Sequence, residues 1–222
     1  MGQPWSFAAL GTFQAGDVDD MLLRNTSTGV FEAYYVESTT LSEQSRRALS
    51  DWTGTFPASA ASPTRGVLSG QAVAPVGNNF QVKGFGHFSQ NTTTQMLMQD
   101  TAGDASSGQL ELYTYQPGTA SFGGINVGKV GLNLNIVGTA DLRGAGSTQM
   151  VMQQDNGNFW LYTYDPNTNS LSGILVGAIG SNFHVVGFGP LGTAGKGREL
   201  MQDAVGNFEV YAYDANQNVF VG

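Results

Sequence analysis

A short aromatic motif recurs at a fixed spacing, and this repeat constrains the fold more than any other feature of the chain. A Tyr-x-Tyr step ends three apolar segments, Leu110–Tyr115, Phe159–Tyr164 and Phe208–Tyr213. The spacing between the first tyrosines of successive steps is 49 residues in both intervals. A repeat of about 50 residues that holds several short strands is typical of a propeller or another repeat array. One such unit cannot bury its own sheet faces, so the copies must pack together in a single domain.

Each copy predicts four strands. In the last copy, apolar and polar residues alternate over Phe183–Gly189, Glu199–Asp203, Phe208–Tyr213 and Asn218–Val221, and Gly206-Asn207 supplies the turn between the middle two. A divergent first copy contains Phe31–Val36. The pattern divides one domain over residues 1–222 into blades at about 5–78, 80–131, 134–180 and 183–222.

The repeat is nearly circular. The spacing from Tyr211 across the chain ends to Tyr34 is close to the internal spacing. A closed ring leaves few unpaired sheet edges. We therefore expect an all-β, four-bladed β-propeller of four-stranded antiparallel blades, as a monomer or small homo-oligomer. The alternative is a dimer that closes an eight-bladed ring.

The first copy is longer than the others by about 30 residues, which fall within 37–79, and insertions into repeat arrays tend to map to one face. Thr40–Glu43 has the form of a capping box, which predicts a short helix over Leu41–Asp51. A loop rich in Pro, Ser, Ala and Gly is predicted from Thr53 to Gly70. The insertion is either a contact element or a surface cover of the blade.

Composition excludes several classes of partner and chemistry. A net charge of −8 and a pI of about 4.5 argue against nucleic acid or an anionic membrane surface as the partner. The chain has no Cys, which excludes disulfides, thiolate metal sites and a Cys nucleophile. No apolar stretch has the length of a bilayer span, and Met1–Trp5 lacks the features of a signal peptide. We expect neither membrane insertion nor a Sec-type leader.

Several segments resemble the FG-GAP or VCBS-type repeat of bacterial β-propellers. The resemblance rests on Gly11–Phe13, Asp20–Phe31, Val137–Leu142, Met150–Gln153 and Val186–Gly189, and it covers nearly the whole chain outside the insertion. It implies a β-propeller of a secreted or cell-surface protein, with a role in adhesion, sugar binding or protein binding.

The same resemblance implies a calcium loop between the first and second strands of each blade, where oxygen ligands alternate along the loop. This chain departs from that pattern, because most ligand positions hold Thr, Gln, His, Ser, Arg, Ala or Pro. No loop keeps enough carboxylates for a tight site, and the first, with Asp17, Asp19 and Asp20, is the one plausible remnant. We expect no cofactor, with calcium at this remnant as the alternative.

Trp160 is the first candidate ligand contact. It replaces an acidic residue that the other copies carry at Glu32, Glu111 and Glu209, so we expect it to be exposed at a blade edge. The tyrosines of the repeated steps are expected to pack between blades, and a sugar-stacking platform is the alternative.

The ends of the second strands predict a polar ring. Repeat symmetry places Arg24, Gln99, Gln153 and Gln202 at equivalent positions, followed by Asp100, Asp155 and Asp203. These side chains either form a repeated site for ligand hydroxyls, or have structural roles. In the structural interpretation, the ring links each blade to the next, and the aspartates cap their own hairpins as Asx turns.

No catalytic set is visible. His87 and His184 lie in unrelated phases of the repeat, and no Ser or Asp partner recurs beside them. We therefore expect a non-enzymatic, lectin-like module that recognises extracellular or cell-surface glycans through repeated sites. The alternative is a protein–protein interaction propeller with the 37–79 insertion as its contact element.

Overall fold

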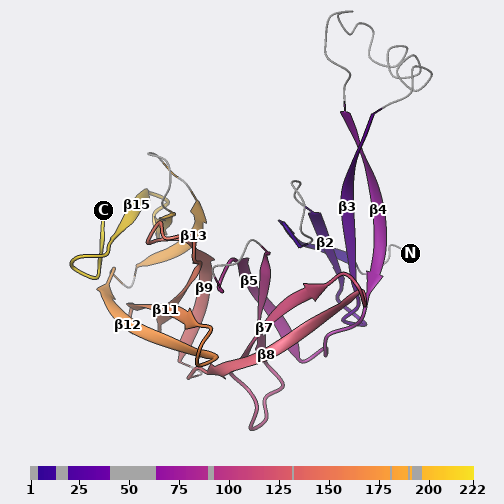
Figure 1. Cartoon of the computed structure of the whole chain (residues 1–222). Helices are drawn as coiled ribbons and strands as arrows, with labels where there is room; N and C mark the ends of the chain where they lie inside the picture. Colours follow the sequence, from indigo (N-terminus) through magenta and orange to yellow (C-terminus); the bar gives the residue numbers. More distant parts are fainter. Residues whose placement is uncertain are drawn as a thin grey trace, which may run out of the picture.

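A computed structural model describes residues 5–13, 20–40, 64–89, 93–131, 133–180, 182–189, 191 and 197–222. Over these residues the chain forms four sheets of four antiparallel strands each, arranged as successive blades around a ring in which the first and last sheets do not pack on each other (Figure 1). This confirms the predicted four-bladed β-propeller. No helix in the described residues is long and apolar enough to cross a membrane.

The strands follow the chain order within every blade. Blade 1 consists of β1 (Trp5–Gly11), β2 (Asp20–Asn25), β3 (Phe31–Thr40) and β4 (Thr64–Val73). Blade 2 consists of β5 (Phe80–Gly86), β6 (Gln95–Asp100), β7 (Gln109–Gln116) and β8 (Ser121–Lys129). Blade 3 consists of β9 (Leu134–Ala140), β10 (Gln149–Gln154), β11 (Asn158–Asp165) and β12 (Ser170–Ala178). Blade 4 consists of β13 (Phe183–Gly189), β14 (Arg198–Asp203), β15 (Phe208–Asp214) and β16 (Val219–Val221).

The core lies between blades, because consecutive side chains of a strand point to opposite sheet faces. On β6, Met96 and Met98 pack against blade 1, whereas Leu97 packs against blade 3. We call the face toward the preceding blade the leading face and the face toward the following blade the trailing face. Apolar clusters fill the junctions between blades 1 and 2, 2 and 3, and 3 and 4. The second tyrosine of each repeated step is buried in one of these clusters, which confirms the expected packing role: Tyr115, Tyr164 and Tyr213.

The same backbone hydrogen bond links the blades at each of these junctions. In each case, the N–H of the residue before a second strand donates to the carbonyl of the residue that follows the first strand of the preceding blade. The three bonds are Thr94 N to Thr12 O (2.7 Å), Thr148 N to His87 O (3.1 Å) and Gly197 N to Asp141 O (2.8 Å). They fix how successive blades are turned relative to one another.

The first blade corrects the predicted insertion. β3 and β4 pair without a break from Phe31↔Val73 to Thr40↔Thr64, so the fourth strand of blade 1 lies inside the 37–79 range. The prediction of a loop from Thr53 to Gly70 is wrong over 64–70, because small residues there gave the segment a loop-like composition. Gly70 suits the strand, since it lies opposite Tyr34 just as Gly124 lies opposite Tyr113 in blade 2. The predicted helix over 41–51 lies outside the described residues.

Candidate functional site

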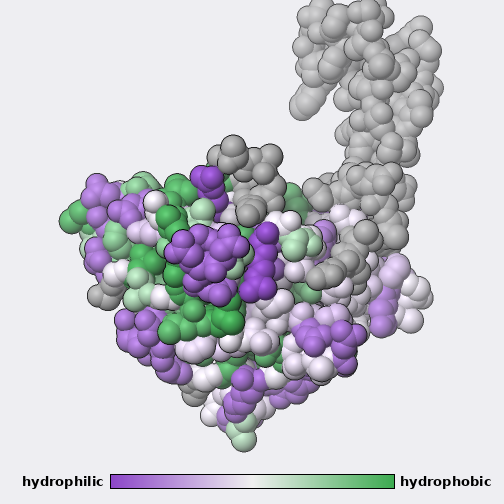
Figure 2. Space-filling view, turned by 60° about the vertical axis from the view of Figure 1, so that its left-hand side comes forward, coloured by the Kyte–Doolittle hydropathy of each residue, from purple (hydrophilic) through white to green (hydrophobic). Residues whose placement is uncertain are grey.

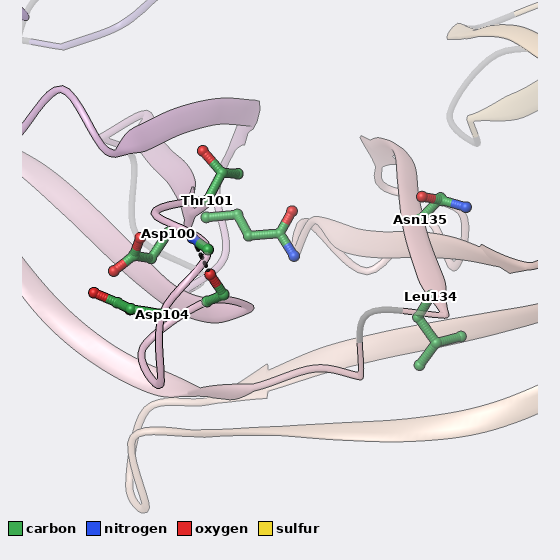
Figure 3. Close-up of a pocket in the computed structure, with 8 residues that line it drawn as sticks. Asp100, Thr101, Asp104, Leu134 and Asn135 are labelled. Atoms are coloured by element: carbon green, nitrogen blue, oxygen red, sulfur yellow. Dashed lines mark hydrogen bonds between the residues drawn. The ribbon is translucent and has the colours of Figure 1, made fainter.

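Two hollows occupy equivalent places at successive blade junctions. The first, of 340 Å³, lies between blades 2 and 3. Figure 3 shows Asp100, Thr101 and Asp104 on its blade 2 side, with Leu134 and Asn135 of β9 opposite them. The second hollow, of 230 Å³, lies between blades 3 and 4. It is lined by Gln153, Gln154 and Asp155 at the end of β10, by Asn135 and Gly157, and by Phe183 at the start of β13.

Strand alternation directs one glutamine toward each hollow. Gln99 shares the trailing face of β6 with buried Leu97, and Gln153 shares the trailing face of β10 with buried Val151. The following blade contributes the first residue of its first strand, which is Leu134 in one hollow and Phe183 in the other. Each hollow therefore combines an amide from one blade with an apolar side chain from the next.

The Gln99 and Gln153 amides are available to a ligand. Within the described part of the chain, neither side chain has a hydrogen-bond partner, and both residues are partly exposed. An amide can donate two hydrogen bonds and accept others, so it can pair with either end of a hydroxyl group. The structural interpretation expected the side chains of the polar ring to link each blade to the next. Gln99 and Gln153 form no such link among the described residues.

That interpretation is confirmed at Arg24, at the junction of blades 1 and 2. Its Nη2 donates a 2.8 Å hydrogen bond to the Phe80 carbonyl, and its guanidinium lies 5.4 Å from the Phe31 ring centroid. Phe80 is the first residue of β5 and so corresponds to Leu134 and Phe183. Arg24 therefore links blades 1 and 2 at the place where the next two junctions each have a hollow.

Gln202 has a different surrounding. Its Nε2 donates to the Gly206 carbonyl of its own hairpin (3.3 Å). Among the described residues, no following blade packs on blade 4 to complete a hollow beside it. The structure thus brings Gln99 and Gln153 into equivalent sites, but not Arg24 or Gln202.

The aspartates mostly cap hairpins, as the structural interpretation predicts. Asp100 accepts hydrogen bonds from Ala102 N (2.8 Å) and Ser106 Oγ (2.6 Å), and Asp203 accepts from Val205 N (3.0 Å) and Asn207 N (2.8 Å). The Ser106 bond is the main cause that lowers the pKa of Asp100. Asp155 follows one residue later in its turn, and its exposed carboxylate accepts from Asn135 Nδ2 at 3.4 Å.

Trp160 is not exposed at an edge, so that prediction is wrong. It is half-buried, packs into the cluster between blades 2 and 3, and lies 6.5 Å from Tyr162 between ring centroids. Its indole Nε1 is buried and has no hydrogen-bond partner within the described part of the chain. In the other blades, the residue at this position accepts a hydrogen bond from the tyrosine two places on: Tyr34 to Glu32, Tyr113 to Glu111, and Tyr211 to Glu209. Sequence could not show that this position faces the preceding blade; a ligand contact at Trp160 stays a prediction.

The calcium remnant is described in part. Asp20 is buried, and its Oδ2 accepts a hydrogen bond from Phe13 N (3.1 Å). Gln95 and Gln149 occupy the same repeat position and also accept from loop amides, so the position caps the loop without needing a charge. Asp17 and Asp19 lie outside the described residues. Within the described residues, no three His, Cys, Asp or Glu side chains are grouped to hold a metal.

Glu199 is the residue that sequence analysis missed. It is fully buried on the leading face of β14, where the equivalent residues are Met21, Met96 and Met150. Neither carboxylate oxygen has a hydrogen-bond partner among the described residues, and burial raises the pKa of this group to about 8. An acidic residue at a position otherwise held by methionine was the signal in the repeat that could have identified it.

Neither a model of a known protein family nor a curated protein matches the chain. The resemblance to FG-GAP or VCBS-type repeats therefore stays a prediction that rests on the segments quoted above.

Proposed function

We propose that the chain is a non-enzymatic binding module that recognises extracellular or cell-surface glycans through the hollows at its blade junctions. A β-propeller fold fits a binding or interaction module. The observation that carries the finer proposal is the equivalence of the two hollows, each with a glutamine amide that has no protein partner within the described residues. The resemblance to FG-GAP or VCBS-type repeats supports the secreted or cell-surface location.

The lining chemistry suits sugars. Sugar rings carry hydroxyl groups that both donate and accept hydrogen bonds, and they also have an apolar C–H face. Gln99 supplies the amide and Leu134 an apolar surface in one hollow, while Gln153 and Phe183 do so in the other. Both hollows are small, so each site binds weakly, and sites repeated around one chain add avidity toward a polymeric glycan.

The aspartates suit binding better than acid–base chemistry. Asp100 is held by hydrogen bonds from its own hairpin, and these lower its pKa, so it stays an anionic acceptor at neutral pH. A general acid would need its pKa raised toward neutral. We therefore assign the exposed Asp155 carboxylate to the rim of its hollow, as an acceptor for ligand hydroxyls, while the buried Asp100 holds the hairpin that lines the other hollow.

A glycan array tests the proposal. We expect the purified chain to bind a restricted set of glycans, and a variant with Gln99→Ala and Gln153→Ala to lose this binding at an unchanged melting temperature. Gln202→Ala is the matched control, because among the described residues that amide bonds to its own hairpin. Trp160→Ala is included to test the sequence-based prediction. An array that is blank for the folded wild type, or binding that survives the double variant, would refute the proposal.

A protein-interaction role is the second candidate, and the β3–β4 hairpin favours it. In blade 2 the corresponding hairpin closes after Gln116↔Ser121, whereas β3 and β4 remain paired out to Thr40↔Thr64 and project from the ring (Figure 1). Replacing residues 38–66 by the 117–120 turn of blade 2 would remove this projection. Loss of captured surface proteins with glycan binding intact would favour the second candidate, and the reverse result would favour the first.

A further inference from the structure

The trailing face of blade 4 exposes apolar side chains that the other blades bury. Phe208 is 58% exposed and Val210 is 39% exposed. The residues at their positions in blades 2 and 3 are at most 1% exposed, because a following blade covers them: Leu110, Leu112, Phe159 and Leu161. Blade 4 therefore carries the apolar residues of a blade junction on its trailing face, although no following blade packs on that face in the described residues.

The leading face of blade 1 shows the complementary feature. Phe7 and Leu10 are each 61% exposed. Their equivalents in blade 2, Val82 and Phe85, pack into the cluster between blades 1 and 2. Blade 1 thus presents the apolar surface that elsewhere packs on a trailing face.

The two open faces do not cover each other. β1 packs against β5, β5 against β9, and β9 against β13, but no comparable contact joins β13 to β1 in the described residues. Blades 1 and 4 stand apart in Figure 1. Figure 2, which brings the left-hand side of Figure 1 forward, shows apolar side chains gathered on the side that carries blade 4. Since backbone hydrogen bonds fix the turn at each formed junction, closing the chain on itself would require those junctions to shift.

We propose that a second copy of this chain covers both faces. The trailing face of blade 4 in one copy packs on the leading face of blade 1 in the other, and the reverse contact forms at the same time. Each contact is the kind of junction that the chain already makes three times, with an apolar trailing face against an apolar leading face. Two identical contacts related by a two-fold axis close the assembly, as closed symmetry requires. Apolar surface left open on both ends would otherwise favour aggregation.

A single introduced cysteine tests this proposal in the intact chain. The chain contains no Cys, so Val210→Cys places one thiol of similar size on the trailing face of blade 4. We expect its alkylation rate to fall severalfold as protein concentration rises through the dimerisation range, and light scattering to report twice the chain mass over the same range. A monomeric mass with the thiol reactive at all concentrations would overturn the proposal. So would a monomeric mass with the thiol protected at all concentrations, since that result would mean closure within one chain.

Paired charge variants show which faces meet. Phe208→Asp and Phe7→Asp should each give folded monomers that melt like the wild type below its dimerisation range, because both side chains are exposed in the single chain. Mixing the two variants should restore a 1:1 pair, since one copy keeps an intact trailing face and the other an intact leading face. Leu175→Asp is the control, because Leu175 is 50% exposed on blade 3, away from both open faces. Dimers that survive either face variant, or a mixture that stays monomeric, would contradict the head-to-tail contact.

Discussion

At the scale of single residues, Glu199 shows how one departure from the repeat changes what a packing position can do. A methionine at this position contributes apolar contact, whereas a buried carboxyl group without partners is stable only in its neutral form. The junction between blades 3 and 4 therefore contains a group that ionises near neutral pH.

Stability should fall as pH rises from about 4.5 to about 8, because the folded chain holds the Glu199 proton over this range and the unfolded chain releases it. The shift in pKa corresponds to about 5 kcal/mol at full ionisation. Glu199→Met should stabilise the chain little at pH 5 and by several-fold more at pH 9. Urea melts of both proteins across this range measure the difference, and parallel pH profiles would contradict it.

Arg24 occupies, at the junction of blades 1 and 2, the repeat position that Gln99 and Gln153 hold at the two hollows. Arg24→Gln would give the blade 1–2 junction the residue found at the two hollows, and it removes the hydrogen bond to the Phe80 carbonyl. We expect a third binding site, together with a loss of about 2 kcal/mol of stability from the lost charged hydrogen bond. Glycan-binding stoichiometry measures the first effect and a chemical melt the second. An unchanged stoichiometry, in a variant that binds otherwise like the wild type, would mean that removing Arg24 does not open a site.

At the scale of elements, each of the three junctions between blades has space for only one side chain at one place. There the last residue of a first strand faces the residue before the second strand of the next blade. A Cβ on Gly86 would overlap the Thr148 side chain, and one on Gly11 would lie 2.8 Å from Thr94 Oγ1. At the third junction the arrangement is reversed, because Ala140 lies opposite Gly197. The pairs Gly–Thr and Ala–Gly thus solve the same steric problem.

This reversal predicts compensation. Gly86→Ala should cost about 2 kcal/mol, since the new methyl group overpacks the junction. Adding Thr148→Gly recreates the pair of the third junction and should recover about 1 kcal/mol, despite the lost Thr148 hydroxyl. A double-mutant cycle by urea denaturation measures the coupling. Additive losses would show that the two positions are not in steric contact.

The strands could be predicted from the sequence because alternation and turn residues are local signals. The equivalence of Gln99 and Gln153 could also be predicted, because repeat symmetry alone places both at the same strand position of one ring. The burial of Trp160 and the missing partners of Glu199 could not be predicted, because they depend on which blade covers each face. β4 was missed for a different reason, since its small residues have the composition of a loop although the segment pairs with β3 as a strand.

At the scale of the whole molecule, packing between blades places repeated residues at repeated surfaces. The apolar clusters set the junctions, and the junctions leave two hollows. Each hollow presents a glutamine amide that has no hydrogen-bond partner among the residues that the structure describes. The central claim is that these two amides contact a ligand with hydroxyl groups.

The most direct measurement is nuclear magnetic resonance of the glutamine side-chain amides during titration with a panel of mono- and disaccharides, a method that detects weak binding. Gln99→Ala, Gln153→Ala and Gln202→Ala identify the three signals. We predict that one class of sugar shifts the Gln99 and Gln153 signals together and leaves the Gln202 signal in place. Shifts confined to other parts of the chain, or no shifts for any sugar, would contradict the account.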